Sequence, residues 1–216
     1  MKYAMLIVFI ITTSIHLYAS LKQNKLLRDK TKPFILLSLL GFYVYSVDEI
    51  NILVVLALVF SWIGDMLLIP RGVKWFSCGG VSFMIAHLFF IAAYSKNIVF
   101  ENINIAYVVT LSLFFIVTVS IIFKNLKPHL PKVLFYPMYL YLLINGAMNC
   151  FAVFRFLSNI ELASIIIVIG AFLFFVSDSS LFFVRFKKNC KLKTHFLVML
   201  TYSIGEFLIV LGLILS

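Results

Sequence analysis

Charged side chains are scarce in this chain, and acidic ones most of all. Only 8 of its 216 residues are Asp or Glu, and charged residues together make up 12%, about half the usual share in soluble domains. Hydrophobic residues make up 63%, and the mean hydropathy is +1.12. This composition excludes an ordinary soluble domain and indicates an integral membrane protein.

The sequence also lacks the motifs of several large enzyme classes. It contains no glycine-rich dinucleotide-binding motif, no P-loop and no GxSxG nucleophile motif. Its three cysteines, Cys78, Cys150 and Cys190, follow no metal-binding spacing, and we interpret them as small apolar residues. The net charge of +10 comes from short basic clusters between apolar runs, without the stacking aromatics of a nucleic-acid-binding face. We therefore expect a membrane-surface role for this charge and no nucleic-acid partner.

Apolar runs between charged or Pro- and Asn-containing breaks predict about eight membrane-spanning helices, because about 20 apolar residues cross the hydrocarbon. Pro33 is expected at the first helical position of the second span, where proline is favoured. No long linker interrupts the pattern. We predict an all-α fold, a single transmembrane bundle that forms one domain over residues 1–216. The predicted spans are residues 3–20, 33–48, 52–69, 76–94, 105–123, 133–155, 161–184 and 195–215.

Positive charge is distributed very unevenly between the predicted loops. The first, third, fifth and seventh loops hold 15 of the 18 Lys and Arg residues, and only Lys2, Lys96 and Arg155 lie on the other side. Cytoplasmic loops carry the excess of Lys and Arg, so both termini are predicted to be non-cytoplasmic. The Lys-, Ile-, Phe- and Asn-rich composition favours a multi-pass protein of a bacterial inner (cell) membrane.

A few ionisable side chains lie within the predicted spans: Asp65 in the third, His87 in the fourth, Asp178 in the seventh and Glu206 in the eighth. An ionised acid near a helix centre costs about 2.5–3.5 kcal/mol, so such groups should face the bundle interior or a water-filled cavity. The third and seventh helices run in the same direction. The two aspartates lie about four and six residues from the predicted helix ends, a depth difference of roughly 3 Å. We therefore predict that Asp65 and Asp178 face one cavity that opens on the cytoplasmic side.

Polar side chains at helical spacing extend this predicted cavity. Three of them recur every four residues in the sixth span, two do so in the eighth, and a serine lies one turn before Asp65. Each of these residues, and the aspartate pair itself, also has a structural alternative, hydrogen bonding between helices that fixes their packing. The candidate substrate-binding or pair-orienting residues are His87, Glu206, Tyr202, Asn145, Asn149, Ser61 and Tyr141.

Three segments carry a family resemblance: IGDMLL in the third span, FMIAHLFFIAAY in the fourth and VSDSSLFF in the seventh. In this order they resemble the YhhN-type lysoplasmalogenase family of multi-span alkenyl-ether hydrolases, over essentially the whole chain. The resemblance places the family's acidic positions on Asp65 and Asp178 and its histidine on His87. It implies hydrolysis of the vinyl ether of a lysophospholipid within the bilayer. The products would be a fatty aldehyde and glycerophosphoethanolamine or glycerophosphocholine.

Two buried carboxyl groups suit this chemistry. A vinyl ether is cleaved once its β-carbon is protonated, and water then captures the oxocarbenium ion. Glycosidases also combine an acid with a carboxylate around such an ion. Two carboxyl groups in a layer of low dielectric constant do not both ionise readily, so one can keep a proton near neutral pH. We expect Asp65 and Asp178 to be the catalytic residues and to share one proton, without a metal ion or cofactor.

Two other functions remain open from the residues alone. An intramembrane aspartyl protease would also place two aspartates on adjacent helices, but the YD and GxGD signatures of those enzymes are absent. A proton-coupled lipid or small-molecule transporter would use the acids and His87 as a relay. The sequence does not specify an oligomeric state.

Overall fold

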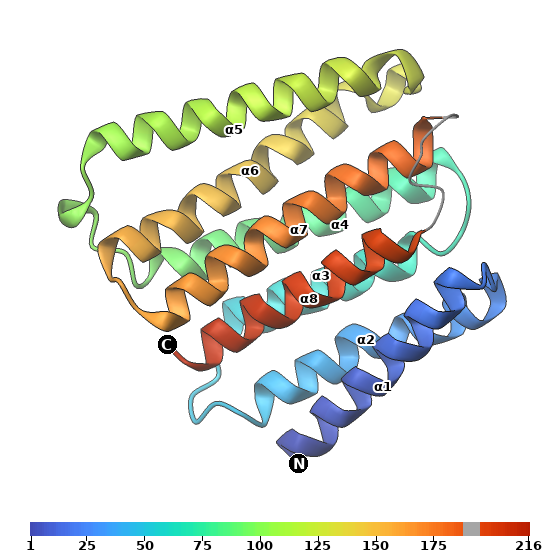
Figure 1. The fold of residues 1–216 in the computed structure, drawn as a ribbon, viewed down its shortest axis with the longest axis horizontal. Helices are drawn as coiled ribbons and strands as arrows, with labels where there is room; N and C mark the ends of the chain where they lie inside the picture. Colours follow the sequence, from blue (N-terminus) through green and yellow to red (C-terminus); the bar gives the residue numbers. More distant parts are fainter. Residues whose placement is uncertain (188–194) are drawn as a thin grey trace.

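Eight α-helices dominate the computed structural model, which describes residues 1–187 and 195–216 (Figure 1). The predicted loop cysteine, Cys190, lies outside these residues. No strand occurs in the described chain, so the prediction of an all-α bundle is confirmed. The helices are α1 (Lys2–Leu21), α2 (Lys25–Val44), α3 (Ile52–Leu67), α4 (Val73–Ser95), α5 (Ile105–Leu126), α6 (Phe135–Ser158), α7 (Leu162–Phe186) and α8 (His195–Ile214), with short 3-10 turns at Phe100–Asn102, Lys127–His129 and Lys132–Leu134.

Six of these helices, all except α2 and α3, are long and apolar enough to cross a membrane. The apolar helix α3 has only 16 residues, and α2 begins with the charged segment KLLRDKTK. The chain is therefore a multi-pass membrane protein. The charged first half of α2 distinguishes this helix from the others and bears directly on the site described below.

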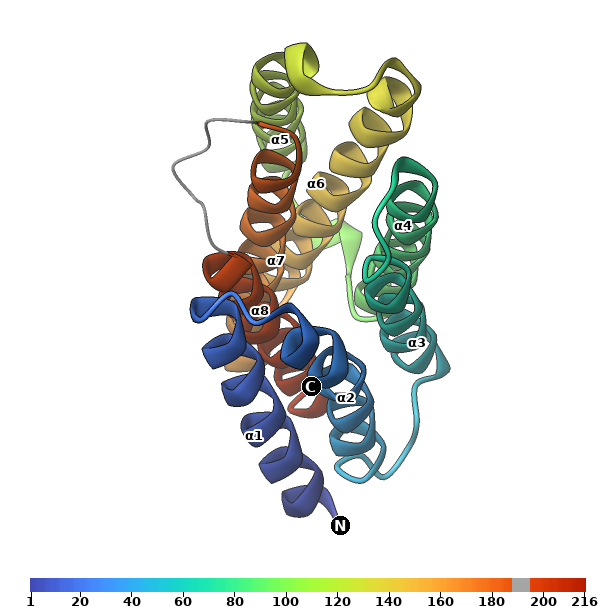
Figure 2. The same cartoon turned by 90° about the vertical axis from the view of Figure 1, so that its right-hand side faces the viewer.

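Seven of the helices in the described chain form a ring, and α5 lies outside it. Each helix of the ring packs on the next in the order α1, α2, α3, α4, α6, α7 and α8, and α8 returns to α1. The remaining helix, α5, packs on α6 and α7, and most of its side chains are exposed. Figure 2 shows this arrangement obliquely from one end of the bundle, with α5 at the outer edge. An apolar helix in this position suits contact with lipid.

Small residues allow α7 and α8 to approach closely. A Cβ atom added to Gly170 would lie 2.8 Å from the backbone oxygen of Gly205 and 2.8 Å from the backbone nitrogen of Ile209. Glycines at such contacts are common between membrane helices because they let backbones meet. Further along, the Ser177 hydroxyl donates a hydrogen bond to the backbone oxygen of Val198 at 2.8 Å. Together these contacts fix the register between the two helices.

The start of α2 differs from the sequence prediction. The helix begins at Lys25, eight residues before the predicted start, so the placement of Pro33 at the first helical position is wrong and Pro33 lies inside the helix. The Asn24 side chain caps the true start by accepting a hydrogen bond from the Leu27 backbone N–H at 3.1 Å. A search for apolar runs misses such a helix because its first turns are charged. The other seven predicted spans agree with their helices to within three residues at each end.

Candidate active site

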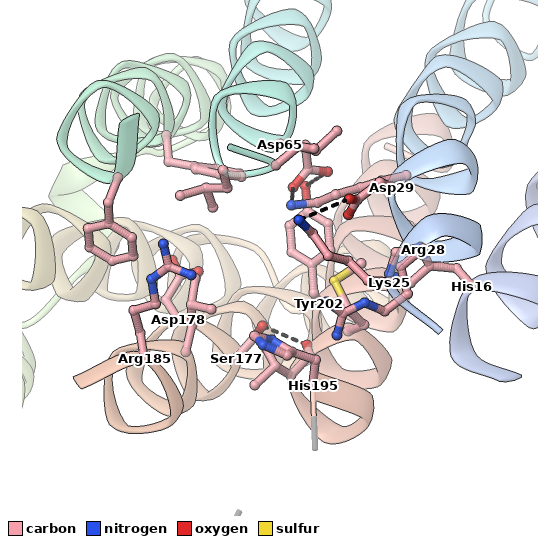
Figure 3. Close-up of a pocket in the computed structure, with 18 of the residues that line it drawn as sticks. His16, Lys25, Arg28, Asp29, Asp65, Ser177, Asp178, Arg185, His195 and Tyr202 are labelled. Carbon is pink, nitrogen blue, oxygen red and sulfur yellow. Dashed lines mark hydrogen bonds and ion pairs between the residues drawn. The ribbon is translucent and has the colours of Figure 1, made fainter. Parts of the chain in front are cut away.

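A cavity of about 140 Å³ opens at the end of the ring where α1 is connected to α2 and α3 to α4. Its wall is formed by α1, α2, α3, α4, α7 and α8, together with the α3–α4 connection. Asp65 and Asp178, which the sequence predicts to face one cavity, both lie in this wall (Figure 3). The lining residues are His16, Lys25, Arg28, Asp29, Lys32, Asp65, Leu68, Ile69, Arg71, Phe76, Phe83, Ser177, Asp178, Leu181, Arg185, His195, Val198, Met199 and Tyr202.

Asp65 is an almost fully buried acid with a cationic partner. It lies two residues before the end of α3 and is 2% exposed. The Lys32 ammonium group on α2 lies 3.2 Å from Asp65 Oδ1, and the Tyr202 hydroxyl on α8 donates a hydrogen bond to Oδ2 at 3.0 Å. The Trp62 indole N–H donates to the backbone oxygen of Pro33 at 3.0 Å and holds α2 against α3 next to this pair. A positive charge at this distance favours the carboxylate form of Asp65.

Asp178 on α7 has a different set of partners. Its Oδ2 accepts a hydrogen bond from the Tyr141 hydroxyl and another from Asn145 Nδ2 at 2.7 Å, both from α6. The ring nitrogen Nε2 of His87 lies 3.8 Å from the same oxygen. Within the described chain, no Lys or Arg forms a salt bridge with Asp178 and its Oδ1 makes no hydrogen bond. Asp178 lines the cavity, and its Oδ1 is the oxygen without a hydrogen-bond partner in the described chain.

The two aspartates therefore do not form the expected proton-sharing contact. No hydrogen bond joins them in the part of the chain that the structure describes. They also lie at different distances from their helix ends, two residues for Asp65 and eight for Asp178. What they share is the cavity, in which each carboxyl group has its own partners.

The other predicted site residues divide into two groups. Asn149 donates to the backbone oxygen of Asn145 at 3.0 Å and to its side-chain oxygen at 3.3 Å, which orients the amide that binds Asp178. Ser61 and Glu206 are fully buried, lie outside the cavity wall and make no side-chain hydrogen bond in the described chain. The structure thus brings Asn149 into the network around Asp178 and shows no hydrogen bond from Ser61 or Glu206 to either aspartate in the described chain.

Sequence reasoning missed the basic side of the cavity. Lys25, Arg28, Asp29 and Lys32 all line it, and their spacing of i, i+3, i+4 and i+7 corresponds to one face of a helix. This periodicity is present in the sequence, but assignment of residues 22–32 to a loop hides it. The remaining basic lining residues are Arg71, Arg185, His16 and His195.

The sequence profile of the YhhN family matches residues 27–213. This range covers most of the chain and contains both aspartates with all of their partners. The chain belongs to the YhhN family, which is the lysoplasmalogenase family. Neither a curated protein nor a solved structure matches the chain. The resemblance carried by the three short segments is therefore confirmed at the level of the family.

Proposed function

We propose that this protein hydrolyses the vinyl ether bond of lysoplasmalogens, releasing a fatty aldehyde and a glycerophospho-alcohol. One observation carries the proposal: two carboxyl groups line one cavity, one beside a lysine and the other bound by hydroxyl and amide donors. These different partners support a division into one carboxylate and one acid, which the reaction needs. Membership of the YhhN family supports hydrolysis of a lipid ether over transport or proteolysis.

Asp178 is the acid in this proposal. Asp178 lines the cavity, and its Oδ1, which has no hydrogen-bond partner in the described chain, can carry the proton that is delivered to the β-carbon of the vinyl ether. Proton transfer converts the carbon–carbon double bond into a single bond and leaves positive charge on the α-carbon and the ether oxygen. The hydrogen bonds from Tyr141 and Asn145 to Oδ2 then stabilise the carboxylate that forms.

Asp65 is the carboxylate that receives the cation. Lys32 and Tyr202 hold it in place, so it can stabilise the oxocarbenium ion and accept a proton from the attacking water. Attack forms a carbon–oxygen bond at the α-carbon and gives a hemiacetal. Collapse of the hemiacetal transfers its hydroxyl proton to Asp178 and a proton from Asp65 to the leaving glycerol oxygen. One water is consumed, and both side chains return to their starting states.

The cavity opens toward the cytoplasm of a bacterial inner membrane in this proposal, with both termini on the opposite side. The bias of Lys and Arg toward one set of connections supports this orientation. A lysolipid would then enter from the cytoplasmic leaflet. A diacyl lipid would not be cleaved, because it has no vinyl ether and its second chain would have to occupy the polar wall of the cavity.

Aldehyde release from a lysoplasmalogen by the purified protein in detergent tests the proposal, with the saturated ether analogue as the substrate control. Asp65→Asn and Asp178→Asn should each lower turnover by about 10²-fold or more, the range typical of general acid–base catalysis. The double variant should be scarcely worse than either single one, because the two groups act in one reaction. Glu206→Gln is the matched control, since Glu206 is a buried acid outside the cavity wall.

Near-normal turnover in either aspartate variant would overturn the mechanism, provided that size-exclusion profiles and thermal unfolding show folded protein. Equal hydrolysis of ester-linked lysolipids would point to a different reaction.

A further inference from the structure

Basic side chains gather around the opening of the cavity. We call Arg28, Arg71 and Arg185 the basic mouth; Lys25 and His195 lie beside them. Lys25 is 3.9 Å from Asp29, and Lys32, whose side chain is mostly buried, pairs with Asp65. By contrast, none of the three arginines forms a salt bridge with a residue of the described chain. Three like charges in the wall of one cavity create a positive potential there that favours binding of an anion.

The basic mouth is assembled from three separate elements. Arg28 comes from α2, Arg71 from the α3–α4 connection and Arg185 from the last turn of α7. The Arg185 guanidinium group lies 5.8 Å from the centre of the Phe76 ring, a cation–π contact that restrains its position. Figure 3 shows Arg185 and Arg28 on opposite sides of the cavity. Residues so far apart in sequence converge on one opening, which a simple basic loop would not achieve.

We propose that the basic mouth binds the phosphate group of the lysophospholipid substrate, a proposal that rests on the proposed function for the identity of that lipid. A guanidinium group is planar and presents paired N–H donors that match two phosphate oxygens, and it stays charged in all conditions relevant here. A phosphate at the mouth is separated from the vinyl ether oxygen by the three-carbon glycerol backbone. Binding there therefore directs the ether into the cavity that contains Asp65 and Asp178.

The same lipid would find apolar contacts beyond the glycerol. Leu68, Phe76, Phe83 and Met199 line the cavity together with the acids. They provide a surface for the first carbons of the alkenyl chain, whereas the charged groups receive the head group. The cavity thus offers both kinds of contact that a lysophospholipid needs, basic side chains for its phosphate and apolar side chains for its chain.

General attraction of anionic lipid to the basic end of the bundle is the competing explanation. Lys30 on α2 and Lys74 on α4 lie at this end, are exposed and do not line the cavity. Like the basic mouth, they add positive charge to this end of the bundle. Because they do not line the cavity, they are not placed to contact a phosphate bound in it. Substitution of these lysines is therefore the matched control.

Steady-state kinetics of Arg28→Gln, Arg71→Gln and Arg185→Gln test the proposal. Each should raise KM for a lysoplasmalogen about tenfold or more, because loss of a hydrogen bond to a charged group weakens binding by about that factor. Each should change kcat by less than about threefold. With 1-alkenylglycerol, which lacks the phosphate, the same variants should match the unchanged protein. Lys30→Gln and Lys74→Gln should leave both substrates unaffected. A KM effect of similar size from these lysines, or an equal loss with 1-alkenylglycerol, would overturn the phosphate site.

Binding of the non-hydrolysable 1-alkyl lysophospholipid separates this proposal from the proposed function. Isothermal titration should show that this lipid binds the unchanged protein at least tenfold more tightly than 1-alkylglycerol does, and that the arginine variants lose the difference. That result together with no aldehyde from any substrate would support the phosphate site and reject the hydrolase. Arginine variants that bind as the unchanged protein does would reject the phosphate site. Displacement of the lipid by inorganic phosphate at comparable concentration would reject the lysophospholipid as the ligand, because the mouth would then be a site for free phosphate.

Discussion

Replacement of Lys32 by methionine tests whether Asp65 is held as a carboxylate. Methionine keeps an unbranched stem of similar length and removes the ammonium group 3.2 Å from Asp65 Oδ1. Removal of one partner of a buried ion pair costs about 3–5 kcal/mol. The Lys32 side chain is 14% exposed and that of Asp65 is 3% exposed, so the pair lies at the partly wetted cavity wall. We therefore expect the lower end of that range, about 3 kcal/mol.

The loss of activity should follow from the same contact. Without the lysine, Asp65 avoids an uncompensated charge by taking up a proton, and it can then neither stabilise the oxocarbenium ion nor accept a proton from water. Aldehyde release should fall about 10²-fold or more, as it does when a general base is removed. Infrared spectra should show an additional protonated carboxylic acid band in Lys32→Met that is absent from Lys32→Met/Asp65→Asn.

Thermal unfolding in detergent completes a double-mutant cycle. Lys32→Met should lower the unfolding midpoint, and addition of Asp65→Asn should recover part of the loss, because the neutral amide does not have to take up a proton to avoid a buried charge. Lys30→Met is the control, since Lys30 lies on the exposed face of α2. Wild-type stability together with full aldehyde release in Lys32→Met would refute the reasoning.

Two further predictions concern the bundle and its orientation. Gly170→Ala should destabilise the protein by about 1–3 kcal/mol, because its Cβ would lie 2.8 Å from two backbone atoms of α8, whereas Gly80→Ala, with nothing within 4 Å, should not lower the unfolding midpoint. Equal midpoints for the two variants would contradict the close α7–α8 contact. Reporter fusions at Arg71 should be cytoplasmic and a fusion after Ser216 should not, because of the charge bias between the connections. A cytoplasmic C-terminus would contradict the predicted orientation.

Much of the fold is readable from the sequence because the bilayer imposes a simple requirement. A helix that crosses hydrocarbon must be apolar over most of its length, so seven of the eight helices have ends within three residues of the predicted ones. The order of the ring follows no such rule. Nothing in the apolar pattern indicates that α5 lies outside the ring or that α6 follows α4 within it.

The candidate site, like the fold, is only partly readable from the sequence. Asp65 and Asp178 stand out because acids are costly in a membrane, and the spacing of Tyr141 and Asn145 relates both to one helix face. Lys32 does not stand out, because a lysine beside a basic connection is also what membrane orientation requires. The sequence therefore identifies the two aspartates, whose charge is costly within a membrane-spanning helix. It does not identify Lys32, because membrane orientation alone already accounts for a lysine at that position.

The single positive charge beside Asp65 links lipid binding to the proposed chemistry. If both aspartates were ionised without a lysine, their negative charge would repel a phosphate approaching through the basic mouth, and no acid would remain to protonate the vinyl ether. With Lys32 in contact, the charge of Asp65 is offset locally and the three arginines keep their positive field at the opening. Asp178, which has no such cation in the described chain, can hold its proton in the same cavity. One lysine, contributed by the charged half of α2, thus allows an anionic lipid and an acid–carboxylate pair to occupy the same cavity.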